Sequence, residues 1–321
     1  MLVAVTGAGG RLGTALRQAV SQSPAVASVL AWDIPEHDLD DPDSAERLVG
    51  QFRPDVVIHA AAWTDVDGCA RDPVLALRRN GAATGEMAQA CVKHGSALVA
   101  ISTNEVFDGL RTDGLPYRPG DRPGPGNPYG AAKLAGEQAA RAAFGATDED
   151  FAEAGLAAPE AKDPSIPPLA IVRTAWLFGP PSSDFPHKII AAAQSAAAEG
   201  RTLALVSDEI GTPTYAADLA RAIAGLLDLA ASRGFGAIGG IHQVVNGGRA
   251  SRADWGREVL RLAGIGVPTR DVPMSAWPRP SVPPPWGVMA ATPLPTGPLR
   301  DWRAAVAEYL TRNSGQQEPP R

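Results

Sequence analysis

A glycine-rich segment near the N-terminus constrains the fold of this chain more than any other feature. Thr6-Gly7-Ala8-Gly9-Gly10-Arg11-Leu12-Gly13 lies directly between an apolar, strand-like run and a segment with helical periodicity. Gly7 allows a tight turn, Gly10 lets the backbone approach a pyrophosphate, and Gly13 lets the helix pack against the strand. The free N–H groups at the helix N-terminus then face the phosphates. The segment therefore predicts the first strand–turn–helix unit of a dinucleotide-binding fold.

An acidic residue follows this segment at the spacing expected for a ribose contact. Asp33 comes 20 residues after Gly13, at the end of the predicted second strand. A carboxylate there can hydrogen-bond the adenosine ribose and repel a 2′-phosphate, which favours NADH. Arg11 can instead offset the charge of that phosphate, so the sequence leaves NADH and NADPH both open. Asp38 and Leu39 are candidates to contact the adenine, with an ordinary loop as the alternative of equal weight.

Short β-branched runs alternate with Ala-rich segments of helical spacing along the chain, which is typical of a parallel sheet covered by helices. We therefore predict an α/β fold with a doubly wound, Rossmann-like parallel sheet and a smaller C-terminal substrate-binding lobe. The dinucleotide-binding domain is predicted over 1–173, with an acidic surface insertion at 147–168 and a return to this domain at 213–245. The other ranges are predicted as the substrate-binding lobe (174–212 and 246–312) and a frayed tail (313–321).

Prolines gather in two segments, and both predict irregular structure. The first, 113–128, is predicted as a loop that leads into a helix from about Asn127 to Phe144. The second, 268–298, carries ten of the 30 prolines, and we predict no regular element within it. One long helix is predicted over 73–94 and a last one over 299–310.

A tyrosine and a lysine lie four residues apart at the start of the helix predicted after the first proline-rich loop. In Tyr129-Gly130-Ala131-Ala132-Lys133 both side chains project from one helical face. A free tyrosine has a pKa near ~10, and a neighbouring ammonium lowers it by favouring the phenolate, which suits general acid–base chemistry. Ser102 and Thr103 end the predicted fourth strand, where a hydroxyl can hydrogen-bond a substrate carbonyl and orient it for hydride transfer.

Taken together, these motifs resemble those of an extended short-chain dehydrogenase/reductase, and specifically the dTDP-4-dehydrorhamnose reductase family. The resemblance covers most of the chain. Its motifs follow the family's order: Thr6–Gly13, Arg53–Asp67, Asn80, Ser102–Gly109, Asn127–Glu137, Val172–Trp176 and Asp208–Thr214.

The resemblance implies delivery of a nicotinamide hydride, from NADPH or NADH, to the C4 ketone of a nucleotide-linked 4-keto-6-deoxysugar. It implies that Tyr129 donates a proton to the forming alkoxide, Lys133 holds the nicotinamide ribose, and Thr103 hydrogen-bonds the carbonyl oxygen. The predicted cofactor-binding positions are Gly7, Gly9, Gly10, Arg11, Leu12, Gly13, Asp33, Asp38, Leu39, Ala60, Ala61, Ala62, Asn80, Ser102, Tyr129 and Lys133. The predicted substrate-binding positions are Thr64, Val66, Asn104, Glu105, Trp176 and Arg279. Trp176 has a core position as its alternative.

Three departures from the family's pattern concern the substrate side. The usual Ser-Thr-Asp-Tyr-Val-Phe is here Ser-Thr-Asn-Glu-Val-Phe, nearer to the Thr-Asp-Glu run of nucleotide-sugar dehydratases. Asn104 cannot supply a proton as a carboxylic acid does, which disfavours dehydration, and Glu105 is either a base or a solvated loop residue, the second being preferred. Glu209 replaces a glutamine. The family's C-terminal Arg-Pro-x-x-Ser-x-Leu becomes 283–289, which lacks that arginine, a natural diphosphate ligand, and Arg279 is its candidate replacement.

Composition excludes several other classes of protein. The net charge is -6, from 29 basic and 35 acidic residues, which argues against a nucleic-acid-binding face. Two cysteines predict no disulfide framework, and five histidines show no metal-ligand spacing, so no metal site is predicted. No apolar run reaches the roughly 18 residues of a membrane helix, and the N-terminus enters a motif by Thr6, leaving no room for a signal peptide. We expect a cytoplasmic protein that binds no membrane.

Alternative functions remain at this point. One is a sugar-nucleotide epimerase or a reductase of another small carbonyl compound. Another is a non-catalytic NAD(P)-binding regulatory subunit that resembles the one of methionine adenosyltransferase, against which the intact Tyr129 and Lys133 argue. The sequence identifies neither the sugar nor its base, and it leaves the oligomeric state open, with a homodimer as one candidate.

Overall fold

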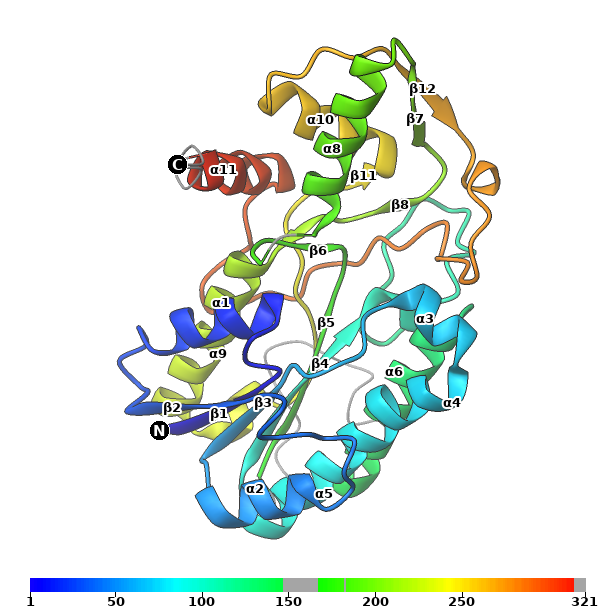
Figure 1. Cartoon of the computed structure of the whole chain (residues 1–321). Coiled ribbons are helices and arrows are strands. Elements are labelled where there is room, and N and C mark those ends of the chain that lie inside the picture. Colours follow the sequence, from blue (N-terminus) through cyan, green and yellow to red (C-terminus); the bar gives the residue numbers. More distant parts are fainter. Residues whose placement is uncertain (147–166, 182, 315–321) are drawn as a thin grey trace.

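A six-stranded parallel sheet forms the centre of the computed structural model, which describes residues 1–146, 167–181 and 183–314 (Figure 1). The strand order is β10-β5-β4-β3-β1-β2, and every neighbouring pair is parallel. The strands are β1 (Leu2–Thr6), β2 (Ser28–Trp32), β3 (Val56–His59), β4 (Ala97–Thr103), β5 (Leu169–Thr174) and β10 (Gly240–Gln243). Chain order reverses between β1 and β3, and the carboxyl ends of strands at such a point form a ligand-binding crevice. The predicted α/β fold class is confirmed.

Helices cover both faces of this sheet (Figure 1). Helices α1 and α9 pack on one face, whereas α2, α5 and α6 pack on the other. Their bounds are α1 (Arg11–Val20), α2 (Ser44–Phe52), α5 (Ala83–His94), α6 (Pro128–Ala143) and α9 (Ala216–Arg233). The chain thus returns to this sheet through α9 and β10, after it has passed through elements that lie elsewhere.

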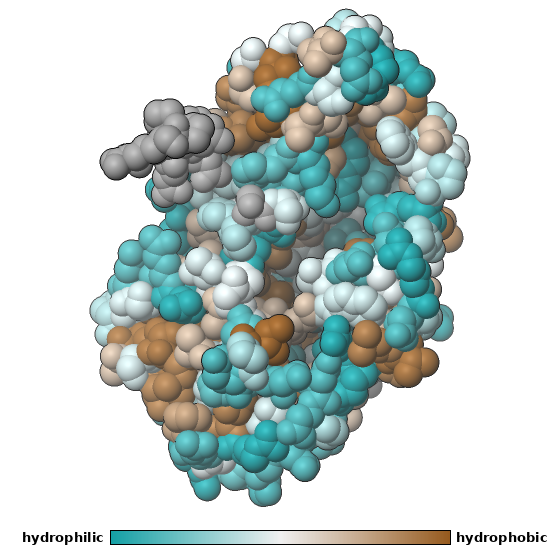
Figure 2. Space-filling view, viewed as in Figure 1, coloured by the Kyte–Doolittle hydropathy of each residue, from teal (hydrophilic) through white to brown (hydrophobic). Residues whose placement is uncertain are grey.

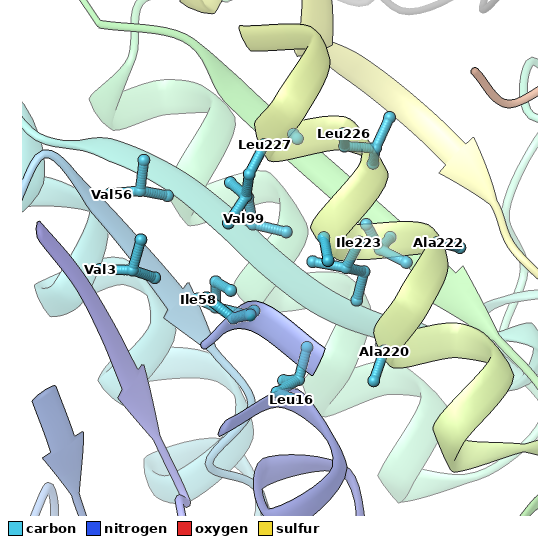
Figure 3. Packing of buried hydrophobic residues seen from close by; sticks show 14 of the residues in the cluster. Val3, Leu16, Val56, Ile58, Val99, Ala220, Ala222, Ile223, Leu226 and Leu227 are labelled. Atoms are coloured by element: carbon cyan, nitrogen blue, oxygen red, sulfur yellow. The ribbon is translucent and has the colours of Figure 1, made fainter. Parts of the chain in front are cut away.

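Alternation along the strands separates the two faces of the core. Val3 and Val5 of β1 belong to the cluster that includes α1 and α9, whereas Ala4 between them belongs to the cluster on the opposite face. Figure 3 shows Ile58 of β3 in the same cluster as Ile223 of α9. Both faces of the sheet are therefore buried, which explains why its strands consist of near-continuous apolar runs.

The segment predicted as one helix over 73–94 is interrupted. It consists of α4 (Pro73–Ala76), a π-helical stretch (Leu77–Ala82) and α5, and it is preceded by α3 (Val66–Arg71). Asn80 lies in the π-helical stretch, where its amide accepts from Trp63 N at 2.9 Å and donates to Trp63 O at 3.0 Å. These paired side-chain hydrogen bonds tie the stretch to the loop after β3.

A second group of elements, which we call the second lobe, lies beyond the carboxyl edge of the sheet (Figure 1). It contains three two-stranded sheets, β11-β8, β12-β7 and β6-β9. Its elements are β6 (Leu177–Phe178), α8 (Phe185–Ala198), β7 (Leu203–Val206), β8 (Ile210–Gly211), β9 (Thr214–Tyr215), β11 (Ala250–Ser251), α10 (Arg252–Leu262), β12 (Thr269–Val272) and α11 (Trp302–Ser314). An aromatic cluster that includes Phe178, Trp255, Trp302 and Tyr309 forms much of its core.

Two predictions about the second lobe need correction. The prediction of no regular element over 268–298 is wrong, because β12 lies there and pairs in parallel with β7. The flanking proline does not prevent this pairing, since Pro268 contributes only its carbonyl, which accepts from Leu203 N at 2.8 Å. The last helix begins at Trp302 rather than at residue 299.

Some sequence predictions concern other parts of the chain. The predicted insertion at 147–168 lies outside the described residues except for its last two positions, and so does the tail beyond Ser314. Both cysteines, Cys69 and Cys91, are free and buried. Within the described residues no helix is long and apolar enough to cross a membrane.

Candidate active site

A cleft of about 840 Å³ opens between the carboxyl edge of the sheet and the second lobe. Figure 2 shows the hollow between the lower and the upper part of the molecule. One end is lined by the glycine-rich turn and Asp33, and the other by Trp176, Arg252 and Trp255. The cleft therefore joins elements that are far apart in the sequence.

The glycine-rich turn has the geometry that a bound dinucleotide requires. Gly7 has φ +61°, and a Cβ on it would lie 2.8 Å from Ala61 Cα. A Cβ on Gly13 would lie 2.0 Å from Gly7 O, so only glycine fits where α1 meets the turn. The N-cap of α1, Gly10, provides no side-chain hydrogen bond, which leaves N–H groups of the first turn available to an anion. The residues present thus fit the pyrophosphate of a nicotinamide cofactor.

Ala60 to Ala62 form the facing wall of the cleft, and two buried side chains hold this segment in place. Thr6 Oγ1 lies 2.9 Å from His59 Nδ1 and accepts from Ala61 N at 3.0 Å. Burial, together with the nearby Lys133 charge, lowers the pKa of His59 to about 3, so the imidazole is neutral. Sequence reasoning noted His59 only as one of five histidines without metal-ligand spacing, and it missed that Thr6 and His59 support the wall formed by Ala60 to Ala62.

Thr103, Tyr129 and Lys133 meet on one wall of the cleft. Thr103 ends β4, while Tyr129 and Lys133 project from the first turns of α6, and all three side chains are buried. Asn127 caps α6 by accepting from Gly130 N at 2.9 Å. A Cβ on Gly130 would lie 2.0 Å from Glu105 O, so this glycine lets α6 approach the turn after β4. Close packing at one backbone contact therefore brings the strand hydroxyl and the helix phenol together.

Burial controls the protonation of this group. Burial raises the pKa of Tyr129, the Glu105 charge raises it further, and a hydrogen bond with Thr103 opposes both. Burial also lowers the pKa of Lys133 to about 8, against the opposing effect of Glu137. The expectation that Lys133 lowers the pKa of Tyr129 is therefore wrong, because burial raises this pKa and the hydrogen bond that opposes the rise comes from Thr103. Tyr129 keeps its proton at neutral pH and is available as a proton donor.

A buried ion pair lies behind the wall that carries Thr103, Tyr129 and Lys133. Glu137 of α6 binds Arg173 of β5 through two contacts, Nε–Oε1 at 2.9 Å and Nη2–Oε2 at 2.6 Å. Ser102 Oγ donates to Glu137 Oε1 at 2.5 Å. Ser102 was predicted to contact the cofactor, but its hydroxyl is directed to Glu137 although the residue lines the cleft. The pair joins α6, β4 and β5 directly behind Lys133 and Thr103.

The other end of the cleft is aromatic and carries a guanidinium. Arg252, the first residue of α10, lies over the Trp176 ring with Cζ 3.6 Å from the ring centroid. Glu209 holds the same guanidinium through an Nη2–Oε1 contact of 2.7 Å. Trp176 has a positive φ of 45° and packs against Gly211, where a Cβ would lie 2.6 Å from the indole. Trp176 thus lines the cleft and also packs against the aromatic core, which combines the two alternatives given for it.

Glu105 lies half-buried on the cleft wall, not in a solvated loop. Its carboxylate accepts from Asn127 Nδ2 at 2.7 Å. Burial raises the pKa of Glu105, and nearby Glu209 adds to this, whereas Asn127, Arg252 and Arg279 act in the opposite direction. Glu105 is therefore protonated more readily than a glutamate in solvent.

Three predicted site residues do not line the cleft: Gly9, Asn80 and Arg279. Asn80 supports Trp63 instead, as described above. Arg279 pairs with Asp67 at 3.0 Å, a residue 212 positions earlier in the chain. The other predicted residues do line it: Gly7, Gly10, Arg11, Leu12, Gly13, Asp33, Asp38, Leu39, Ala60, Ala61, Ala62, Thr64, Val66, Ser102, Thr103, Asn104, Glu105, Tyr129, Lys133 and Trp176.

Several lining residues were not predicted, among them His37, Arg79, Phe185, Lys188, Arg252 and Trp255. The sequence carries a signal for the start of the helix at Arg252, because Ser251 and Asp254 have the spacing of a capping box, which the structure forms. No sequence signal indicates where the Arg252 side chain points, because its direction depends on contacts with Trp176 and Glu209.

Fold and site together define a Rossmann-like short-chain dehydrogenase/reductase. Residues 1–148 and 154–314 match the family model described as the RmlD substrate binding domain. The chain is 34% identical over 314 residues to dTDP-4-dehydrorhamnose reductase of Mycobacterium tuberculosis H37Rv, covering 95% of this chain and 91% of that protein. It therefore belongs to the dTDP-4-dehydrorhamnose reductase family, and the family indicated by the sequence motifs is confirmed.

Other relatives extend the comparison. The dTDP-4-dehydrorhamnose reductase of Streptomyces griseus is 34% identical over 321 residues, covering 98% of this chain and 95% of that protein. A crystal structure of dTDP-4-dehydrorhamnose reductase from Clostridium acetobutylicum superposes with a TM-score of 0.82 at 28% identity, covering 98% of this chain and all of the other. The Bacillus anthracis enzyme, in complex with NADP, gives a TM-score of 0.79 at 25% identity, covering 97% of this chain and 99% of the other.

Proposed function

We propose that this protein reduces the C4 ketone of a nucleotide-linked 4-keto-6-deoxysugar with NADH or NADPH. One observation carries the proposal: Thr103, Tyr129 and Lys133 lie on one wall of a cleft that continues to the glycine-rich turn. Membership of the dTDP-4-dehydrorhamnose reductase family supports it, because relatives with that name are 34% identical over nearly the whole chain.

The bound nicotinamide supplies the hydride. Tyr129, protonated at neutral pH because burial raises its pKa, donates its Oη proton to the alkoxide that forms on the substrate. Thr103 Oγ1 hydrogen-bonds the substrate oxygen where negative charge develops. Lys133 holds the ribose next to the nicotinamide and places a positive charge beside Tyr129. The remaining walls exclude water and orient the two reactants.

Arg252 and Trp176 supply the substrate end of the cleft. Trp176 offers an aromatic surface to the sugar, and Arg252 supplies a positive charge to the anionic part of a nucleotide sugar. The segment 283–289, which lacks the family's arginine, is held by main-chain contacts such as Gly287 N to Ile210 O at 2.7 Å. Arg252 therefore takes the role for which Arg279 was the sequence-based candidate.

Cofactor oxidation tests this proposal directly. The purified protein is mixed with NADH or NADPH and a series of dTDP-4-keto-6-deoxyhexoses, and the loss of reduced cofactor is followed. We expect turnover with at least one sugar, and its loss in Lys133→Met. Lys93→Met is the matched control, because Lys93 is exposed and pairs only with Glu46 among the described residues. Binding of cofactor without turnover of any such sugar would contradict the proposal.

A second candidate, epimerisation next to the ketone, is favoured by one observation. Glu105 lies on the cleft wall with a raised pKa, and its charge raises the pKa of Tyr129. A base at this position can exchange the proton on the carbon next to a ketone. The homodimer and the cytoplasmic location expected from the sequence stay predictions.

A further inference from the structure

A buried threonine hydroxyl at the cleft has no hydrogen-bond partner among the described residues. Thr174 is the last residue of β5, it is 5% exposed, and it lines the cleft. Its Oγ1 atom is buried and makes no hydrogen bond within the part of the chain that the structure describes. A buried hydroxyl without a partner destabilises a fold, so native proteins contain few of them. The packing of the chain alone therefore does not explain a threonine at this position.

The register of the sheet places Thr174 beside Thr103. The two residues are Cα partners at the ends of β5 and β4, and neighbouring strands lie roughly 4.8 Å apart. The partners one position earlier, Ser102 and Arg173, both bind Glu137 of α6 on one face of the sheet. Because successive side chains of a strand point to opposite faces, Thr103 and Thr174 share the other face. Their side chains therefore stand next to each other at the edge where the cleft opens.

The two hydroxyl groups differ in what they contact. Thr103 Oγ1 accepts from Glu105 N at 3.2 Å and forms a hydrogen bond with Tyr129. The hydroxyl of Thr174 keeps its proton and its lone pairs available, as far as the described residues are concerned. It can therefore donate to a carbonyl or hydroxyl oxygen and accept from an amide N–H. The reactants of the proposed reduction carry groups of this kind.

We propose that Thr174 binds a reactant beside Thr103, and that its hydroxyl donates to a carbonyl or hydroxyl oxygen of that reactant. Nicotinamide carries such an oxygen in its carboxamide, and the keto sugar carries several in its ketone and hydroxyl groups. The same hydrogen bond satisfies the buried hydroxyl in either case, and it forms only when the cleft is occupied. The inference rests on the proposed function in requiring these two reactants.

Equilibrium binding to full-length Thr174→Val tests this role, because valine keeps the shape of the side chain and removes the hydroxyl. Cofactor fluorescence gives the Kd for NADH and NADPH. Calorimetry with protein loaded with the oxidised cofactor gives the Kd for a dTDP-4-keto-6-deoxyhexose without turnover. We expect a rise of about three- to tenfold, as the loss of one hydrogen bond predicts. A rise for the reduced cofactor identifies the carboxamide as the partner, and a rise for the sugar alone identifies the sugar. Unchanged Kd values for both ligands would overturn the proposal.

Thermal stability separates binding from packing. Without ligands, Thr174→Val should melt at or above the wild-type temperature, because the variant lacks the unpaired buried hydroxyl. Thr292→Val is the matched control, since Thr292 is equally buried but its Oγ1 accepts from Gln243 N at 2.9 Å. We expect this control to lose thermal stability and to keep the wild-type Kd values. A lower melting temperature of Thr174→Val together with weaker binding would assign Thr174 to packing and overturn the proposal.

A serine variant and the wild-type activity complete the test. Thr174→Ser keeps the hydroxyl and should bind both ligands within about twofold of the wild type. Binding by Thr174→Ser that is as weak as binding by Thr174→Val would contradict the role of the hydroxyl. Turnover by the wild type, with unchanged binding by Thr174→Val, supports the proposed reaction and contradicts the role of Thr174. Weaker cofactor binding by Thr174→Val, with no turnover of any keto sugar by the wild type, supports the role of Thr174 and contradicts the proposed reaction.

Discussion

Arg252 lies over the Trp176 ring, with the guanidinium carbon 3.6 Å from the centroid of the indole. Glu209 fixes the guanidinium from one side, and Gly211 leaves room for the indole. The contact joins α10, β8 and the segment after β5 at the end of the cleft opposite the glycine-rich turn. It gives the site a planar, positively charged surface at a place where the family's C-terminal arginine is missing.

Removal of this guanidinium should weaken substrate binding more than it slows the chemical step. For Arg252→Ala we expect KM for the keto sugar nucleotide to rise about tenfold or more, with a smaller change in kcat. Arg252→Lys should recover only part of this, because lysine does not stack on an indole as arginine does. Steady-state kinetics give both values. Arg257→Ala on the same helix is the control, since Arg257 pairs with Asp271 away from the cleft. An unchanged KM in Arg252→Ala would show that Arg252 does not bind the keto sugar nucleotide.

Loss of the phenol should remove the proton donor and leave the fold intact. For Tyr129→Phe we expect kcat to fall by about 10²–10⁴, the range typical of general acid catalysis. Thermal unfolding should be nearly unchanged, because the ring still fills its buried position. A kcat within a few-fold of wild type would show that another group donates the proton.

The charge on Lys133 should give the reaction an alkaline limit. Its pKa is lowered to about 8 by burial, so the ammonium loses its proton as the pH rises through that value. We expect kcat/KM for the sugar, which reports the enzyme before the sugar binds, to fall above about pH 8. The pH profile is measured with saturating cofactor and limiting sugar. A profile that stays flat to about two units above that pH would contradict a catalytic ammonium.

The ion pair between Glu137 and Arg173 should be important for stability. Both side chains of Glu137 and Arg173 are almost fully buried. Removal of one partner leaves an uncompensated buried charge, so Glu137→Gln should lower the free energy of unfolding by about 3–5 kcal/mol. A double variant, Glu137→Met with Arg173→Met, should lose less of the free energy of unfolding than Glu137→Gln alone. Urea denaturation measures both, and a larger loss in the double variant would contradict this reasoning.

A substitution of Glu105 should distinguish reduction from epimerisation. Glu105→Gln removes the only carboxylate within the Ser102–Phe107 turn, and the proposed reduction should continue at a measurable rate. Exchange of solvent deuterium into the carbon next to the ketone, if the wild type performs it, should stop in this variant. Proton NMR in deuterated buffer follows both reactions. Loss of reduction together with exchange would show that Glu105 takes part in the reduction itself.

Local spacing explains what could be predicted from the sequence. The turn from Gly7 to Gly13 and the Tyr129–Lys133 pair depend on residues that are neighbours in the chain, so motif reasoning found them. The positions that sequence reasoning misjudged depend on distant contacts. Arg279 is bound by Asp67, Ser102 is bound by Glu137, and neither partner is near in sequence.

Burial and tertiary packing account for the remaining differences. The pKa of Tyr129 rises because the folded chain buries the phenol. This burial cannot be predicted from the four-residue spacing between Tyr129 and Lys133. Strand β12 forms in a proline-rich segment because β7, more than sixty residues earlier, offers it a parallel partner. Both the raised pKa of Tyr129 and the formation of β12 depend on contacts between distant parts of the chain, so they could be found only from the structure.

Transfer of a labelled hydride tests the central claim most directly. The protein is incubated with a dTDP-4-keto-6-deoxyhexose and NADH or NADPH that carries deuterium at the transferred position, and the sugar product is examined by NMR. We predict that the deuterium appears at C4 of the reduced sugar, with one equivalent of cofactor oxidised for each sugar reduced. Oxidation of the cofactor without deuterium at C4, or recovery of both reactants unchanged, would contradict the account.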